Sequence, residues 1–138
     1  MKYQWDASLE TGHLRIDNQH KQLFNTVNNI TDLTEQGKGK EEINKTVEFL
    51  VSYTVMHFDG EEKLMEIYHY PDYPNHKDIH TNFKNKVGEL SKRLAVEGPT
   101  DEVMKTLAST VGDWLIIHIK GEDIRMAAYI KSKGDSGQ

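Results

Sequence analysis

Five histidines and two carboxylates recur at spacings that would turn them toward the common axis of a helical bundle. Burying such side chains without partners in an apolar core costs several kcal/mol. A metal ion offsets that cost, and imidazole together with carboxylate oxygen suits iron, manganese or zinc better than magnesium or calcium. The spacing therefore predicts a metal site built from His20, His57, Glu61, His76, His80, His118 and Asp123.

Seven candidate ligands are too many for a single zinc or iron ion that keeps an open position. They suit two metal ions, with Glu61 and Asp123 as bridges. Two divalent ions would carry more positive charge than two carboxylates neutralise, which favours an additional bridging hydroxide or oxide. The chain has no cysteine, so disulfides and thiolate sites are excluded and any metal must be held by nitrogen and oxygen.

Helical periodicity explains how these side chains would reach one place. The clearest stripe covers residues 43–68 in steps of four and three, and His57 and Glu61 occupy two of its inward positions, one turn apart. The next stripe begins with His76 and His80, again one turn apart. Each pair lies on the face that its helix would turn toward the other helices.

Two further helices complete the pattern. The first is expected at about residues 17–35, with Asp17 as its cap and His20 on its inward side. The fourth follows Gly98-Pro99, with Thr100 or Asp101 as its cap. Short connections between the four segments predict an all-α fold, an antiparallel up-down-up-down four-helix bundle. In that topology the candidate ligands lie near the same end.

Asp123 does not fit the ideal periodicity of the fourth helix. It follows His118 by five residues, and five residues turn an ideal α-helix by about 500°, so the two side chains would point roughly 140° apart. Either a one-residue bulge near Gly121 restores their alignment, or Asp123 reaches the metals from a flank. The sequence leaves both alternatives open.

The 138 residues are expected to form a single domain (1–138), with an N-terminal arm at 1–16, the bundle at 17–132 and a polar tail at 133–138. The formal net charge of −5 argues against a nucleic-acid binder. The chain has neither a membrane-spanning apolar run nor an apolar signal-peptide core, so a cytoplasmic location is expected. The arm carries apolar residues that should pack on the bundle: Trp5, Leu9, Leu14 and Ile16.

Four motifs in this order resemble a known family, the hemerythrins, and in particular bacterial hemerythrin-like domains. Each motif is weak alone, but together they span nearly the whole chain and leave no ligand position of the family empty. The motifs are Ile16-Asp17-Asn18-Gln19-His20-Lys21, His57-Phe58-Asp59-Gly60-Glu61-Glu62, His76-Lys77-Asp78-Ile79-His80 and His118-Ile119-Lys120-Gly121-Glu122-Asp123.

The resemblance implies a non-haem di-iron centre, with an oxo or hydroxo bridge, that binds dioxygen reversibly. An apolar pocket around it would limit the turnover of bound dioxygen. Candidates to line that pocket are Leu23, Phe24, Phe83, Trp114 and Ile119. The family's ligand pattern carries over as His76, His80 and His118 on one iron, His20 and His57 on the other iron with an open position, and Glu61 and Asp123 as bridges.

Five neutral imidazoles stabilise high iron oxidation states less than a carboxylate-rich site does, so binding is favoured over catalysis. The chain is therefore predicted to be an oxygen carrier, or the oxygen-sensing module of a signalling or chemotaxis protein, rather than an enzyme. Its expected partners are dioxygen, with azide or nitric oxide in its place, and a signalling domain if it senses. The alternatives are a di-iron oxidase, peroxidase or nitric-oxide-handling enzyme, and a purely structural metal bundle.

The remaining polar residues near these motifs have plainer interpretations. His13 and His69 are expected to pack at the surface, and Asp59 and Glu62 to lie at the surface or beside the ligands. The tyrosines at 68, 70 and 73 should close one end of the bundle.

Overall fold

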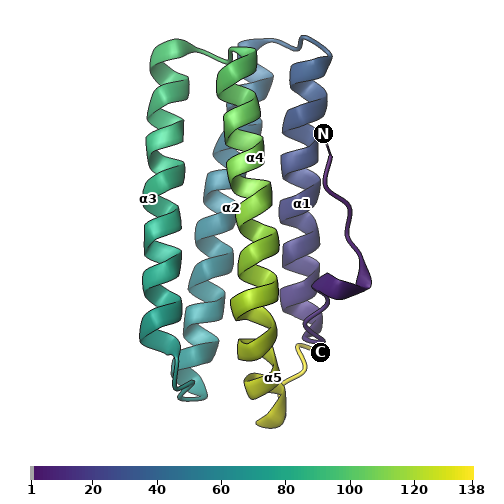
Figure 1. Ribbon diagram of the computed structural model, residues 1–138, viewed down its shortest axis with the longest axis vertical. Coiled ribbons are helices and arrows are strands. Elements are labelled where there is room, and N and C mark those ends of the chain that lie inside the picture. Colours follow the sequence, from purple (N-terminus) through teal and green to yellow (C-terminus); the bar gives the residue numbers. More distant parts are fainter. Residues whose placement is uncertain (1) are drawn as a thin grey trace.

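Four long helices stand side by side in the computed structural model, which describes residues 2–138 (Figure 1). They run antiparallel, and contacts between α1 and α2, α2 and α3, α3 and α4, and α4 and α1 close them into a bundle. No strand occurs among the described residues. The predicted all-α four-helix bundle is thus confirmed. The helices are α1 (Leu14–Glu35), α2 (Lys40–Ile67), α3 (Tyr73–Glu97) and α4 (Asp101–His118), followed by the π-helical segment η2 (Ile119–Asp123) and α5 (Ile124–Ser132).

The start of α1 differs from its prediction. The helix begins three residues earlier than Asp17, and His13 is its cap, because the His13 imidazole accepts the backbone N–H of Ile16 at 3.3 Å. Asp17 lies within the first turn and accepts the backbone N–H groups of Thr11 at 2.9 Å and Gly12 at 3.2 Å. The prediction that Asp17 caps the helix was therefore wrong: Asp17 ties the arm to the helix instead.

The caps of the other helices follow the sequence more closely. Thr100 caps α4, because its hydroxyl accepts the backbone N–H of Val103 at 3.2 Å. Pro74 lies in the first turn of α3, where its missing N–H leaves no helical hydrogen bond unmade. These signals place His76 and His80 in the first turns of α3. They place His118 at the last residue of α4.

The buried core falls into two apolar clusters, and several of the candidate ligands lie between them along the helices. On α1, for example, His20 lies between Ile16 of the smaller cluster and Leu23 of the larger one. On α2, Glu61 lies between Phe58 and Met65 in the same way. The larger cluster fills most of the bundle. The smaller one consists of Ile16, Met65, Met126, Ala127 and Ile130, with Tyr68, Tyr70, Tyr73 and Tyr129 packed against it.

The N-terminal arm runs along α1 (Figure 1). The 3-10 turn η1 (Ala7–Leu9) buries Leu9 in the larger cluster, and Trp5 packs against that cluster. Leu14, which was expected to pack on the bundle, is 50% exposed. Its position on the outward side of the first turn of α1 explains the difference.

The C-terminal segment folds back over the start of α1. The backbone N–H of Leu14 donates to the Ser136 carbonyl at 2.8 Å, and the His13 imidazole lies 3.2 Å from the Asp135 carboxylate. The Tyr68 hydroxyl donates to the same carboxylate at 3.1 Å. His13 is fully buried beneath these residues, so its predicted place at the surface was wrong.

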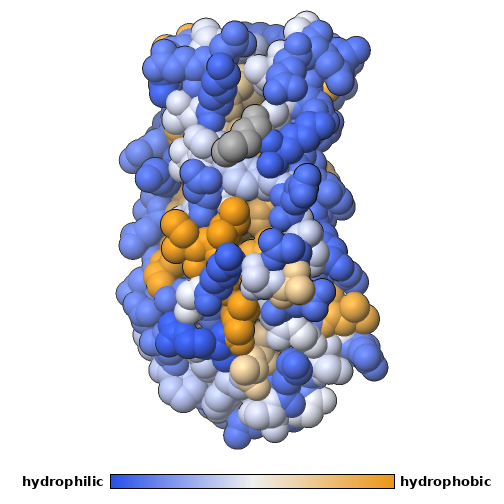
Figure 2. All heavy atoms as spheres, turned by 45° about the vertical axis from the view of Figure 1, so that its right-hand side comes forward, coloured by the Kyte–Doolittle hydropathy of each residue, from blue (hydrophilic) through white to orange (hydrophobic). Residues whose placement is uncertain are grey.

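Most of the surface in Figure 2 is hydrophilic, apart from a hydrophobic patch near the middle of that face. This distribution follows from helices that bury one stripe each and expose the rest. Among residues 2–138, no helix is apolar over a length sufficient to cross a membrane.

Candidate metal centre

The structure brings all seven predicted ligand residues together at one end of the bundle. Each is at least 97% buried. Every long helix contributes: α1 supplies His20, α2 supplies His57 and Glu61, α3 supplies His76 and His80, α4 supplies His118, and η2 supplies Asp123.

The segment η2 brings Asp123 to the same side as His118. In a π-helical turn, residues five apart hydrogen-bond, and the backbone N–H of Ile124 donates to the carbonyl of Ile119 in this way. As a result, an Asp123 oxygen lies 3.0 Å from Nε2 of His118. The structure thus has the bulge, the first of the two alternatives for this helix. Gly121 is not needed for it sterically, because a Cβ built there would meet no atom within 4 Å.

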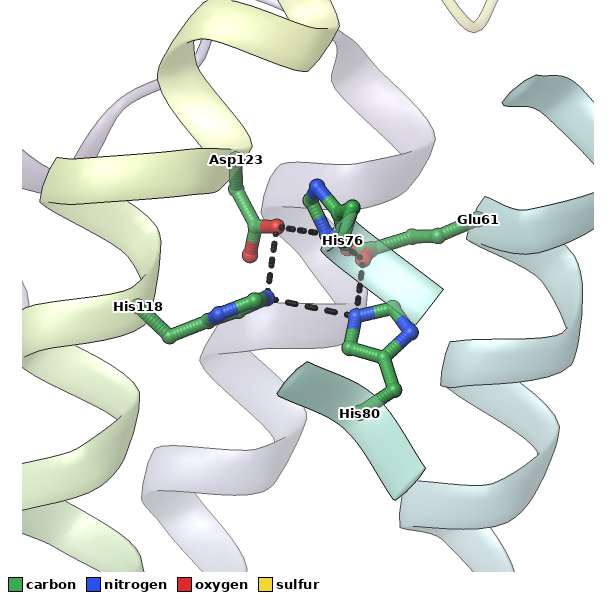
Figure 3. A group of neighbouring side chains, drawn as sticks. All are labelled: Glu61, His76, His80, His118 and Asp123. Atoms are coloured by element: carbon green, nitrogen blue, oxygen red, sulfur yellow. Dashed lines mark hydrogen bonds and ion pairs between the residues drawn. The ribbon is translucent and has the colours of Figure 1, made fainter. Parts of the chain in front are cut away.

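The seven side chains form two overlapping groups whose donor atoms lie within 4.8 Å of one another. One group holds three histidines and the other holds two, and both contain Glu61 and Asp123. Figure 3 shows the first group, in which the Asp123 and Glu61 carboxylates flank His76, and Asp123 also lies beside His118 and Glu61 beside His80. The groups are Glu61, His76, His80, His118 and Asp123, and His20, His57, Glu61 and Asp123.

Each carboxylate directs one oxygen to each group. Glu61 Oε1 lies 3.2 Å from Nε2 of His80, whereas Glu61 Oε2 lies 2.8 Å from Nε2 of His57. Asp123 Oδ1 lies 3.1 Å from Nε2 of His76, whereas Asp123 Oδ2 lies 3.0 Å from Nε2 of His20. Two carboxylates that each face two sets of imidazoles have the arrangement required to bridge two metal ions.

The hydrogen bonding of the site fits a metal better than a self-contained polar network. Ten buried side-chain nitrogen and oxygen atoms among the described residues lack a hydrogen-bond partner, and nine of them belong to the candidate ligands. Six of the nine face the site, namely both oxygens of Glu61 and of Asp123 and Nε2 of His20 and of His76, which lie within ion-pair distance of one another without forming hydrogen bonds. The other three are the outer Nδ1 atoms of His20, His76 and His118. Unpartnered buried polar atoms are rare and costly in native proteins, whereas lone pairs that converge on one point are what a metal ion satisfies.

Without metal, the two carboxylates favour the protonated form of nearby histidines. Burial alone would lower the pKa of His20, but the nearby Asp123 and Glu61 carboxylates outweigh it and raise the pKa to about 9. Burial would likewise lower the pKa of His76, but the same two carboxylates outweigh it and raise the pKa to about 10. Burial would raise the pKa of both carboxyl groups, but the surrounding histidines, His57 for Glu61 and His118 for Asp123, hold it well below its usual range.

Two of the ligand imidazoles have hydrogen-bond partners on their outer side. Nδ1 of His57 lies 2.7 Å from the side-chain oxygen of Gln19, and Nδ1 of His80 lies 2.9 Å from the Glu62 carboxylate. The sequence placed Glu62 at the surface or beside the ligands, and it lies beside one. Gln19 was missed, although its position next to His20 on α1 is the signal that could have found it.

Aromatic rings pack on the imidazoles. Phe58 stacks on His80 with ring centroids 3.9 Å apart, and Trp114 stacks on His118 at 4.3 Å. Phe83 stacks in turn on Trp114 at 3.8 Å. The sequence proposed Phe83 and Trp114 for this neighbourhood but missed Phe58, although it directly follows His57.

The remaining residues proposed for the pocket also belong to the larger apolar cluster. Leu23, Phe24 and Ile119 are each at least 98% buried. The ring of Trp5 lies near both Phe24 and His20, with ring centroids 5.9 and 6.4 Å away. Apolar and aromatic side chains of the larger cluster therefore enclose the histidines of the site.

Comparison with known proteins identifies relatives along most of the chain. The family model described as the hemerythrin HHE cation binding domain matches residues 11–130. A bacteriohemerythrin from Pseudomonas aeruginosa (strain LESB58) is 35% identical over 141 residues, which cover 96% of this chain and 90% of that protein. A myohemerythrin from Theromyzon tessulatum is 31% identical over 123 residues, 89% of each chain. A crystal structure of a wild-type hemerythrin superposes with a TM-score of 0.84 at 30% identity, covering 93% of this chain and 97% of that one.

Proposed function

The chain belongs to the hemerythrin family, and on that basis we propose which of its side chains hold the metal ions and how they serve dioxygen binding. The family is one of oxygen-binding proteins with a di-iron centre rather than of enzymes, and this chain binds dioxygen at such a centre. The proposal concerns the assignment of ligands, the open position and the biological use.

We propose that Glu61 and Asp123 bridge the two irons, that His76, His80 and His118 complete one site, and that His20 and His57 complete the other. The observation that carries this assignment is that each carboxylate directs one oxygen to each set of imidazoles. The group with His20 and His57 offers one protein ligand fewer than the other group. That difference leaves room for an exogenous ligand on the two-histidine side.

When bound, the iron pair supplies the electrons on which reversible dioxygen binding draws. The chain's own residues have a different task, which is to hold the donors in place and to keep water and protons away from them. The stacked rings of Phe58 and Trp114 and the buried side chain of Ile119 serve the second task. A dry, apolar enclosure would keep solvent protons away from the site and so limit the turnover of bound dioxygen. The proposed pocket residues are Leu23, Phe24, Phe83, Trp114 and Ile119.

Metal analysis of a bridge variant tests the assignment. Glu61→Ala should lower iron content from two ions per chain, because both sites lose a ligand, and the exposed Glu48→Ala on the same helix should keep both ions. Full iron occupancy in the Glu61 variant would contradict bridging by this residue. Helical circular dichroism of each variant separates lost ligation from lost folding.

The open position has a separate test. Azide added to the oxidised iron protein should change its visible spectrum, because an exogenous anion enters the vacant site. A purely structural metal bundle predicts an unchanged spectrum. Ile119→Glu should alter the rate of azide entry or of autoxidation while both irons remain, and unchanged rates would place Ile119 outside the pocket.

We propose carriage or sensing as the use of this centre. The choice between them remains a prediction, as do nitric oxide binding, a signalling partner and a cytoplasmic location. Sensing requires that ligand binding alter the arm or an end of the bundle, since a change confined to the irons transmits nothing. Hydrogen exchange at residues 133–138 in the ferrous protein, with and without dioxygen, distinguishes them. A change in protection favours sensing, and equal protection favours carriage.

A further inference from the structure

The five ligand imidazoles differ in what their outer nitrogens meet. In His20, His76 and His118, Nδ1 is buried and has no hydrogen-bond partner among residues 2–138. Only His57 and His80 have Nδ1 partnered, at 2.7 Å and 2.9 Å. In both of these rings Nδ1 faces an oxygen that can only accept, so Nδ1 carries a hydrogen and donates it outward, while Nε2 faces the Glu61 carboxylate and the site.

The two acceptors differ in charge and serve different halves of the centre. His57, in the two-histidine group, donates to the neutral amide oxygen of Gln19. His80, in the three-histidine group, donates to the carboxylate of Glu62. Each hydrogen bond crosses a helix interface, from α2 to α1 in the first case and from α3 to α2 in the second. The bonds are alike in geometry, and only one of them brings a negative charge.

The surroundings of Glu62 preserve the effect of that charge. Its side chain is only 12% exposed, and no lysine or arginine side chain among residues 2–138 lies within ion-pair distance of it. Phe58 covers one face of the His80 ring at a centroid distance of 3.9 Å and an interplanar angle of 4°. Screening by water and by counter-charges is therefore weak between Glu62 and the ring.

A hydrogen bond from Nδ1 to an anion makes the opposite nitrogen of an imidazole a stronger electron donor. A stronger donor stabilises the oxidised state of the metal that it ligates. We propose that Glu62, through His80, lowers the reduction potential of the three-histidine half of the centre relative to the two-histidine half, where Gln19 leaves His57 a weaker donor. Glu62 is thus a positioning residue that also sets how readily the centre yields electrons.

This inference rests on the proposed function, because it requires that His80 and His57 ligate different irons. It also assigns different roles to the two halves of the centre, one in electron supply and the other in ligand binding. The half that lacks room for an exogenous ligand contributes its electron more readily, and the half with the open position keeps a less basic histidine set. Electron supply and ligand access are then tuned by different side chains.

Two opposite substitutions test the proposal. Glu62→Gln keeps an oxygen acceptor of the same length and removes the charge, whereas Gln19→Glu adds a charge beside the other half. Glu48→Gln is the control for the loss of one negative charge, because Glu48 is exposed on α2 and far from the candidate ligands along the helix. The measurement is the ratio of reduced to oxidised centre at equilibrium with a redox dye of fixed potential, under argon, with iron content and helicity recorded for each protein.

Glu62→Gln should raise that ratio about tenfold and Gln19→Glu should lower it, while Glu48→Gln should match the wild type. A ratio in Glu62→Gln equal to that of the control, with two irons bound, would show that Glu62 only holds the ring in place and would overturn the proposal. If Glu62→Gln loses iron, the Gln19→Glu protein decides, because an unchanged ratio there also overturns it. A wild-type chain with fewer than two irons overturns the proposed function itself, which separates the two failures.

Discussion

Metal binding to the iron-free protein should release at least two protons per chain near pH 7.5. In the iron-free cluster the carboxylates of Glu61 and Asp123 raise the pKa of His20 to about 9 and that of His76 to about 10, against the opposing effect of burial. Both imidazoles are therefore protonated at pH 7.5, and both carboxyl groups are ionised because their pKa is lowered. Metal ligation requires neutral imidazoles, so both protons must leave.

The magnitude follows from linkage. Each proton displaced makes the binding constant rise tenfold per pH unit, so two protons make the combined constant for two metal ions rise about 100-fold per unit between pH 7 and 8.5. The dependence should weaken as the pH rises through 9 and 10, because the histidines of the iron-free protein then lose their protons before metal arrives. Affinity therefore increases with pH and levels off on the alkaline side.

Zinc is a suitable probe, because it binds the same donors and has no redox chemistry. Anaerobic titration of the iron-free protein in a weakly buffered solution with a pH indicator counts the protons directly, and calorimetry in two buffers of different ionisation enthalpy provides an independent count. Release of fewer than one proton at pH 7.5, or an affinity independent of pH up to 8.5, would show that the iron-free core does not hold paired histidinium and carboxylate groups.

Three substitutions probe the supports of the site. Phe58→Ala removes the ring stacked on His80 and should lower the free energy of unfolding by about 3–5 kcal/mol in urea denaturation; a loss below about 1 kcal/mol would mean that neighbours refill the space. Gly121→Ala should be neutral or stabilising by up to about 1 kcal/mol with both irons retained, since its Cβ meets nothing, and iron loss would show that η2 needs glycine. His13→Ala should cost about 1–2 kcal/mol by loss of the cap. Because burial lowers the pKa of His13, the wild type should lose stability as the pH falls below 6.5, and thermal unfolding at pH 7.5 and 5.5 should show less of this loss in the variant.

The sequence predicted the bundle and its ligand face because both depend on a repeating signal. Steps of four and three residues identify the buried side of a helix, and a histidine on such a stripe is conspicuous. The π-helical turn at 119–123 was visible as a mismatch in that repeat. Its form was not, because a bulge and a reach from the flank satisfy the same spacing and differ only in backbone hydrogen bonds.

Contacts between distant segments were beyond the sequence. His13 is buried because residues 135–137 fold back over it, and nothing in the composition of a polar tail indicates where it will lie. Gln19 and Glu62 lie off the buried stripes and look like solvated surface residues. Their reach to a histidine on a neighbouring helix depends on helix separation and rotation, which a periodic pattern does not specify.

The position of the centre between the two apolar clusters gives the metals a second, mechanical role. A layer of seven buried polar side chains would separate the small cluster around Met65 and Met126 from the main core, because unpaired polar groups weaken the packing between them. Two ions bound by ligands from all four long helices would instead join the helices across that layer. Since the arm, the tail and the tyrosines cover the same end, loss of the metals should weaken this end of the bundle first. Any change at the irons therefore bears first on the elements that cover this end.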